Sequence, residues 1–254
     1  MNLIEESHIR FVNLDSRWDR LDLMTKACDL AYIPAVRMRG MLPSEYKGDP
    51  KRVAVMQKRT PGAIGCHFSQ VKIMEDALKR EKHAWVMEDD LIFCEDFHIR
   101  LHYIERFLAK HDWDILWLGA TFHINPPYWH KTDLGRDAET TDDPRMLRTF
   151  GAFCTYAYIV RDRSIARVLH LLDEQLEESM GIDWAMIQIQ PRLHAYAFVP
   201  GSVIQRDNKS DIGRGMTIFS GFSKLGPYWF QQNLDEFDPA TFEWHEANQN
   251  KGKT

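Results

Sequence analysis

Closely spaced cysteines are missing from this 254-residue chain. Its four cysteines lie far apart and form no C-x-x-C pair, which argues against a zinc site. Each lies in an apolar stretch, so we expect reduced, buried thiols. The four are Cys28, Cys66, Cys94 and Cys154.

Long apolar runs are missing as well. No segment approaches the roughly 20 apolar residues that a membrane-spanning helix needs. The stretch from Met1 to Glu6 lacks the basic region and the following apolar region of a secretory signal. We therefore expect a cytoplasmic protein without a transmembrane segment, for which peripheral association with a membrane through a partner stays open.

Positive charge is in short supply too. The chain has 32 lysines and arginines against 37 aspartates and glutamates, giving a net charge of -5. This balance argues against nucleic acid held by bulk electrostatics, whereas a few local basic residues suffice to bind a phosphorylated small molecule. Aromatic residues are plentiful at 12%, and they line sugar-binding clefts as well as cores.

Predicted strands and helices alternate along the chain. This alternation is typical of an α/β fold with a mainly parallel central sheet flanked by helices, here one domain with an irregular C-terminal third. Asp15 or Ser16 is expected to cap the first helix. We expect strands at 8–14, 33–38, 84–87, 115–119, 152–160 and 195–199, helices at 16–30, 62–78, 97–109, 164–176 and from 181, and an irregular excursion at 120–148.

The leading site candidate is an acidic triplet formed by Glu88, Asp89 and Asp90, which follows a predicted strand. Clustered carboxylate oxygens suit a hard divalent cation. In open α/β sheets, ligands also collect beyond the carboxyl ends of strands. A solvated acidic turn is the alternative, but the apolar residues on both sides of the triplet argue against full exposure.

Polar residues also follow the first predicted strand. Asn13, Asp15, Arg17 and Arg20 fit a nucleotide pocket. In that pocket Asn13 faces a base and an arginine pairs with phosphate. A capped helix with arginines on its surface explains the same pattern equally well.

Two predicted helix starts are further candidates. Gly62 and Gly65 let a ligand approach the backbone at a helix N-terminus, with Ser69 about one turn further on, although tight packing also explains the glycines. Asp183 precedes Trp184 at the other start. The local pattern favours a helix cap for Asp183, and the alternative is a general base with a raised pKa.

Eight short motifs follow one another between about residues 8 and 212. Together they resemble glycosyltransferase family 25, which comprises the lipooligosaccharide galactosyltransferases and related enzymes of LPS biosynthesis and is related to the collagen galactosyltransferases. Two positions depart from the family pattern, since Gln70 and Tyr156 stand where histidines are common. The motifs are FVNLDSRWDR (11–20), GAIGCHFS (62–69), EDD (88–90), WDILWLG (113–119), TYAYIV (155–160), DW (183–184), VIQ (203–205) and SDI (210–212).

The resemblance implies a GT-A-like domain over residues 1–254, with a nucleotide-sugar-binding half at 1–120 and an acceptor-binding half at 121–254. It implies an inverting, metal-dependent glycosyltransferase. The enzyme would move a hexose, galactose or glucose, from a UDP-sugar to a saccharide or glycan acceptor. Mn²⁺ is favoured over Mg²⁺ as the cofactor.

The resemblance also suggests roles for single residues. Glu88, Asp90 and Asp211 are the expected metal ligands, and Asp183 is the expected base. The residues expected to bind the donor are Asn13, Asp15, Arg17, Arg20, Gly62, Ile64, Gly65, Ser69, Asp89 and Gln205.

Two other functions fit parts of the pattern. A metal-dependent phosphoesterase or nuclease holds two cations in an acidic cluster, but it needs further acidic or histidine ligands for which the sequence shows no matching spread. A non-catalytic nucleotide-sugar-binding module would keep the fold and lose the chemistry. The intact acidic triplet argues against such a module.

Overall fold

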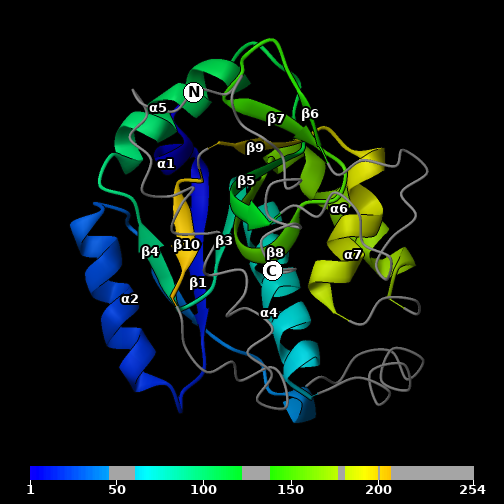
Figure 1. Cartoon of the computed structure of the whole chain (residues 1–254). Coiled ribbons are helices and arrows are strands. Elements are labelled where there is room, and N and C mark those ends of the chain that lie inside the picture. The colour runs from blue at the N-terminus through cyan, green and yellow to red at the C-terminus, as the bar shows by residue number, and fades with distance from the viewer. Residues whose placement is uncertain (46–60, 122–137, 177–180, 200, 207–254) are drawn as a thin grey trace, which may run out of the picture.

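Eight strands form the central sheet of the computed structural model, in the order β2-β1-β3-β8-β5-β9-β7-β6 (Figure 1). The structure describes residues 1–45, 61–121, 138–176, 181–199 and 201–206. The strands of this sheet are β1 (Ser7–Asn13), β2 (Val36–Arg39), β3 (His83–Met87), β5 (Ile115–Thr121), β6 (Ala138–Thr140), β7 (Met146–Thr149), β8 (Phe153–Val160) and β9 (Ala195–Phe198).

The pairing of these strands is mixed. β1 runs parallel to β2 and β3, and β5 runs parallel to β9. β8 lies between β3 and β5 and is antiparallel to both, while β7 is antiparallel to β9 and β6. The expected α/β class is confirmed, and the reversed direction of β8 brings the start of that strand to the edge where β1, β3 and β5 end.

A second, two-stranded sheet lies beside the first. It pairs β4 (Leu91–Phe93) with β10 (Val203–Gln205) in antiparallel fashion, and Gln205 lies opposite Leu91. Neither strand is predicted from the sequence, because three residues are too few to show a period of two. This small sheet connects the segment after the acidic triplet to a segment more than 100 residues further along the chain.

Helices cover both faces of the central sheet (Figure 1). α2 and α5 pack with one hydrophobic core, and α4, α6 and α7 pack with the other. The helices are α1 (Leu3–Glu6), α2 (Trp18–Leu30), α4 (Pro61–Leu78), α5 (Phe97–Leu108), α6 (Ile165–Glu174) and α7 (Ile182–Ile189), with short 3-10 turns at Pro43–Glu45, Asp162–Ser164 and Gln190–Arg192.

The central strands are apolar because both of their faces are covered. All five residues of β3 are buried, and in β8 only Phe153 is partly exposed. A strand covered on both sides reads as a nearly continuous apolar run rather than an alternating one. Trp85, Trp113 and Trp117 are fully buried in this core, so these tryptophans pack the interior instead of lining a cleft.

Two sequence predictions about local structure are wrong. Arg17 is the residue that precedes α2, and it makes no capping bond with its side chain, so neither Asp15 nor Ser16 caps this helix. The Asp15 carboxylate instead pairs with Arg37 of β2 at 2.5 Å. The expected irregular excursion over 120–148 contains a β-hairpin, because Ala138–Thr140 pairs with part of Met146–Thr149.

Within the described ranges, no helix is long and apolar enough to cross a membrane. The expected cytoplasmic location stays a prediction. The division of the chain into a donor-binding half and an acceptor-binding half also stays a prediction.

Gly119 lies where β5 passes closest to β8 and β10. A Cβ atom at this position would lie 2.4 Å from the carbonyl oxygen of Val203 and 2.6 Å from ring atom Cε2 of Tyr156. The pairing of β5 with β8 also shifts register on either side of Gly119. A residue without a side chain is therefore required for the three strands to approach one another.

We expect Gly119→Ala to lower the free energy of unfolding by about 1–3 kcal/mol, because the backbone oxygen of Val203 cannot move aside as a flexible side chain would. Gly201→Ala is the matched control, since a Cβ there meets its nearest atom, the same oxygen, at 3.6 Å. Urea unfolding of both variants measures the difference. Equal stability would show that the strands separate easily at Gly119.

Candidate active site

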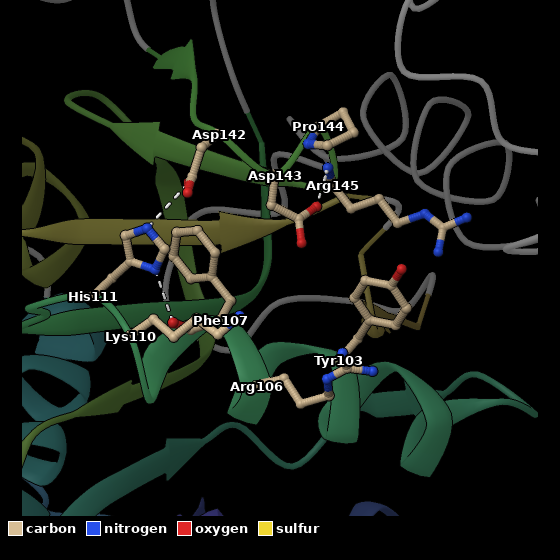
Figure 2. Close-up of a pocket in the computed structure, with 9 residues that line it drawn as sticks. All are labelled: Tyr103, Arg106, Phe107, Lys110, His111, Asp142, Asp143, Pro144 and Arg145. Carbon is tan, nitrogen blue, oxygen red and sulfur yellow. Dashed lines mark hydrogen bonds and ion pairs between the residues drawn. The ribbon is translucent and has the colours of Figure 1, made fainter.

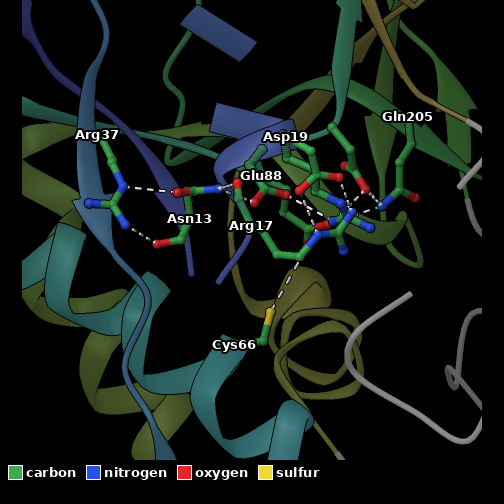
Figure 3. A network of polar contacts seen from close by, with 10 residues as sticks. Asn13, Arg17, Asp19, Arg37, Cys66, Glu88 and Gln205 are labelled. Carbon is green, nitrogen blue, oxygen red and sulfur yellow. Dashed lines mark hydrogen bonds and ion pairs between the residues drawn. The ribbon is translucent and has the colours of Figure 1, made fainter. Parts of the chain in front are cut away.

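The acidic triplet lies at the edge of the sheet where β1 and β3 end. These strands are parallel neighbours, with Phe11 opposite Met87, so the residues that follow each strand come together. Asn13 from β1 and Glu88 from the end of β3 belong to one network of polar contacts (Figure 3). The structure brings Asn13, Arg20 and the triplet together at this edge.

Asp89 points into the protein. Its side chain is 9% exposed, and its Oδ2 accepts a 2.7 Å hydrogen bond from Nδ2 of Asn13. Its Oδ1 pairs with the guanidinium of Arg20 at 2.9 Å. A buried carboxylate with a cation and an amide donor is fully compensated, so Asp89 has a structural role in this geometry.

Asn13 connects three elements of the site. Its Nδ2 also donates to the carbonyl oxygen of Arg17 at 3.0 Å, and its Oδ1 accepts from Nε of Arg37 at 2.9 Å. The side-chain amide of Asn13 is therefore used inside the protein (Figure 3). Its expected contact with a nucleotide base stays a prediction.

The guanidinium of Arg20 lies between two carboxylates. Besides its bond to Asp89, it pairs with Oδ2 of Asp90 at 3.1 Å, and all three side chains are nearly buried. The expected phosphate contact of Arg20 stays a prediction, since its guanidinium already pairs with the triplet.

Arg17 and Asp15 lie nearer the surface than Arg20. Arg17 makes a two-pronged pair with Asp19, at 3.0 and 2.9 Å, and the Asp19 side chain is 50% exposed (Figure 3). Asp15 is 64% exposed beside Arg37. Donor contacts of Arg17 and Asp15 stay predictions.

Glu88 and Asp90 converge on a single nitrogen atom. Nε2 of Gln205 lies 3.1 Å from Oε2 of Glu88 and 3.2 and 3.3 Å from the two carboxylate oxygens of Asp90. The backbone N–H of Arg206 donates to the carbonyl oxygen of Asp90 at 2.7 Å and fixes this approach. β10 thus places Gln205 against the triplet, and the expected contact of Gln205 with the donor stays a prediction.

The charge of this cluster is unbalanced. Burial raises the pKa of Glu88 well above its usual value. The negative charges of Asp90, Asp183 and Asp89 raise this pKa further. Arg20 lowers it but does not cancel the shift. The site therefore disfavours another negative charge and favours a cation.

Asp183 reaches the same site from α7. Gly181, not Asp183, precedes this helix, so the reading of Asp183 as a helix cap is wrong. Its Oδ1 instead accepts from the backbone N–H of Thr155 at 2.8 Å and from the Thr155 hydroxyl at 2.6 Å. Burial raises the pKa of Asp183, and the two bonds from Thr155 oppose that shift.

The predicted helix-start residues lie on α4. The Ser69 hydroxyl donates to the carbonyl oxygen of Gly65 at 2.6 Å and accepts from the N–H of Met41 at 2.8 Å. Ile64 is buried against Phe68 in a small apolar cluster. Ser69, Gly65 and Ile64 are therefore packing residues in this geometry, and their expected donor contacts stay predictions.

Gly62 lies in the first turn of α4, which begins beside the start of α7. A Cβ atom built on Gly181 would lie 3.8 Å from Cβ of Ala63. Two helix starts, each with backbone N–H groups that no helical carbonyl can satisfy, thus lie side by side near Asp183.

No three His, Cys, Asp or Glu side chains in the described part of the chain are grouped so that they could hold a metal ion unaided. Glu88 and Asp90 supply two carboxylates, and Asp211, the third expected ligand, lies outside the described residues. The expected metal set is therefore neither confirmed nor contradicted.

Three neighbours of the site were missed by the sequence analysis. Arg37 bonds to Asn13, Cys66 lies with its sulfur 3.9 Å from Oε1 of Glu88, and Thr155 bonds to Asp183. Thr155 and Cys66 lie inside motifs that carried the family resemblance, which was the available signal. Arg37 lies in an ordinary strand, and nothing in its local sequence marks it.

A cavity of about 480 Å³ lies between α5 and the turn before β7, and none of the predicted site residues lines it (Figure 2). His111 stacks on Phe107 there, with ring centroids 3.8 Å apart, and pairs with Asp142 at 3.0 Å. The guanidinium of Arg145 lies over the Tyr103 ring at 5.0 Å. The acidic cluster is thus separate from this cavity.

Comparison with known protein families identifies the family of this chain. The family described as glycosyltransferase family 25 (LPS biosynthesis protein) matches residues 7–176, more than half of the chain. A search of curated proteins found no match. The matched range contains the acidic triplet, Asn13 and Thr155, and it ends before Asp183 and Gln205.

We expect Arg20→Met to lower the free energy of unfolding by about 3–5 kcal/mol, because it leaves buried carboxylates without their cation. Arg17→Met is the matched control from the same helix start. It removes a pair with a half-exposed aspartate and should change stability little. Chemical denaturation measures both, and an equal effect of the two changes would contradict the structural role of Arg20.

Proposed function

Because the chain belongs to glycosyltransferase family 25 and is a glycosyltransferase, we propose that it moves a hexose, galactose or glucose, from a UDP-sugar to a saccharide or glycan acceptor. We further propose GT-A-type chemistry with a divalent cation and inversion at the anomeric carbon. The observation that carries this proposal is the convergence of Glu88 and Asp90 at the edge where β1 and β3 end. The family membership argues against the phosphoesterase, the nuclease and the non-catalytic module.

The residues present fit a hard cation. Mg²⁺ and Mn²⁺ bind through one or two carboxylates and complete their coordination with water and substrate phosphates, so two converging carboxylates suffice. The raised pKa of Glu88 supports this, since a cation would relieve the excess negative charge. Glu88 and Asp90 would hold the ion, and Asp211 is the proposed third ligand. When bound, the ion neutralises charge that develops on the diphosphate leaving group.

The adjacent starts of α4 and α7 suit the anionic part of the donor. Backbone N–H groups without a carbonyl partner in their own helix, together with the helix dipole, favour negative charge at a helix N-terminus. Gly62 leaves the first turn of α4 without a bulky side chain. We propose that the diphosphate lies between these helix starts and the acidic cluster, with Arg17 and Asp15 nearer the nucleoside.

Asp183 is the proposed general base. An inverting transfer needs a group that takes the proton of the acceptor hydroxyl on the side opposite the leaving group. Asp183 is partly exposed, and its charge raises the pKa of Glu88, so it lies beside the proposed cation site. Burial raises its pKa, which brings a carboxylate closer to the basicity that proton transfer near neutral pH requires.

We expect release of UDP from a UDP-hexose to stop with EDTA and to return with added Mn²⁺. Glu88→Gln and Asp90→Asn should each raise the Mn²⁺ concentration needed for half-maximal activity, because each removes one carboxylate ligand. Glu95→Gln, an exposed glutamate in the adjoining segment, is the control that should behave as wild type. The measurement is a panel of nucleotide sugars assayed with Mn²⁺, Mg²⁺ or EDTA. Activity that EDTA does not change would refute the proposed requirement for a divalent cation.

We expect Asp183→Asn to lower turnover about 10²–10⁴-fold, which is the usual contribution of a general base, while donor affinity changes little. The amide keeps an oxygen that can accept from Thr155, so the fold around α7 is preserved. Asp173→Asn, an exposed change on the neighbouring helix α6, serves as the control. Steady-state kinetics and donor titration test this, and unchanged turnover would remove Asp183 from the mechanism.

A further inference from the structure

A chain of hydrogen bonds leads from Asp183 into the core. The hydroxyl of Thr155 lies 2.6 Å from Oδ1 of Asp183 and 3.3 Å from Nε2 of Gln70. The Tyr158 hydroxyl lies 2.9 Å from Oε1 of the same glutamine. Thr155, Gln70 and Tyr158 are buried, with at most 2% of each exposed.

The donor and acceptor of each hydrogen bond in this series follow from the Asp183 carboxylate. An ionised carboxylate only accepts, so the Thr155 hydroxyl must give its single proton to Asp183. The Thr155 oxygen then accepts from the amide NH₂ of Gln70. This turns the amide oxygen of Gln70 toward Tyr158, whose phenol donates.

Tyr158 can hold the far end of the chain because it keeps its proton. Burial raises the pKa of the Tyr158 phenol well above its usual value, and the charges of Cys66, Asp183 and Glu88 add to this. Its ring packs beside Trp117, with centroids 5.4 Å apart, which restrains its orientation. This series of hydrogen bonds thus connects Asp183 in the site to a residue that is fixed in the core.

An irregularity in β8 makes this series of hydrogen bonds possible. Thr155 and Tyr158 are three residues apart, and a regular strand would point them to opposite faces. Here both reach Gln70 of α4. The pairing with β5 shifts register between Trp117 and Gly119, and again before Thr121, and Cys154 has a positive φ of 73°. Such irregularities re-aim side chains near active sites.

We propose that Thr155, Gln70 and Tyr158 are positioning residues that lock Asp183 and assign its two oxygens different tasks. Oδ1 accepts both bonds from Thr155, which makes it the less basic oxygen. Oδ2 is the oxygen that takes the acceptor's proton. This inference rests on the proposed role of Asp183 as the base.

The step balances without another reactant. The acceptor hydroxyl gives its proton to Oδ2 of Asp183 while its oxygen forms the new bond to the anomeric carbon. The bond from that carbon to the diphosphate oxygen breaks on the opposite side, and its electron pair leaves with the nucleoside diphosphate.

Thr155→Val tests the proposal, because valine keeps the shape and the backbone N–H of this residue and removes only the hydroxyl. We expect kcat to fall about 10–100-fold, the scale of a misplaced catalytic group, with the donor KM within about twofold of wild type. The acidic limb of the kcat profile should move to higher pH, because Asp183 loses a bond that lowers its pKa. Thr155→Ser should restore both values.

The matched variants separate the possible outcomes. Among the described residues, the charge of Asp183 affects the pKa of three titratable groups, Glu88, Cys66 and Tyr158. Thr155→Val leaves these three residues in place, so a shifted profile reports on Asp183. Tyr158→Phe should lower kcat by less than Thr155→Val, since it acts through Gln70. Thermal unfolding confirms that each variant is folded.

Two results would overturn the positioning role while leaving Asp183 as the base. The first is wild-type kcat and an unshifted profile in Thr155→Val, measured beside an inactive Asp183→Asn. The second is a loss of activity in Thr155→Val that Thr155→Ser does not restore and that leaves the profile unmoved. Full turnover in Asp183→Asn would instead refute the proposed function itself, and this inference with it.

Discussion

The buried pairing of Asp89 with Arg20 and Asn13 is the interaction on which the site depends. Three consecutive carboxylates repel one another, and burial makes that repulsion stronger. The middle one, Asp89, is paired with a cation and an amide, and the outer two, Glu88 and Asp90, converge on Nε2 of Gln205. Pairing of one carboxylate thus stabilises the turn that brings its two neighbours together.

The site thus has a rigid half and a reactive half. Asn13, Arg20 and Asp89 are buried and satisfy one another, which fixes the ends of β1 and β3. The charges of Asp90 and Asp183 raise the pKa of Glu88, so the turn after β3 and helix α7 bring three carboxylates close together. Catalytic groups must hold their geometry closely, and a buried polar network behind them supplies that restraint.

The class of the fold and the location of the candidate site could be predicted from the sequence, because the alternation of strand and helix patterns and the acidic triplet are local signals. The contact of Gln205 with Glu88 was not predicted from the sequence, since the two residues lie 117 positions apart. The true partner of Asp183 could not be read locally, because Asp at a helix start normally suggests a cap, whereas here a neighbouring strand supplies the hydrogen-bond donors. The mixed pairing escaped prediction as well, since β8 reads alike in either direction.

Because β8 runs against β3 and β5, the edge with the candidate site contains the opening residues of one strand as well as the closing residues of others. A purely parallel sheet would have to recruit such residues from loops, which vary and move. Here the backbone N–H of Thr155 donates to Oδ1 of Asp183, and its carbonyl oxygen accepts from Nε2 of Gln70. The hydrogen bonds that hold Asp183 therefore come from a central strand, so that changes in the surrounding loops leave them in place.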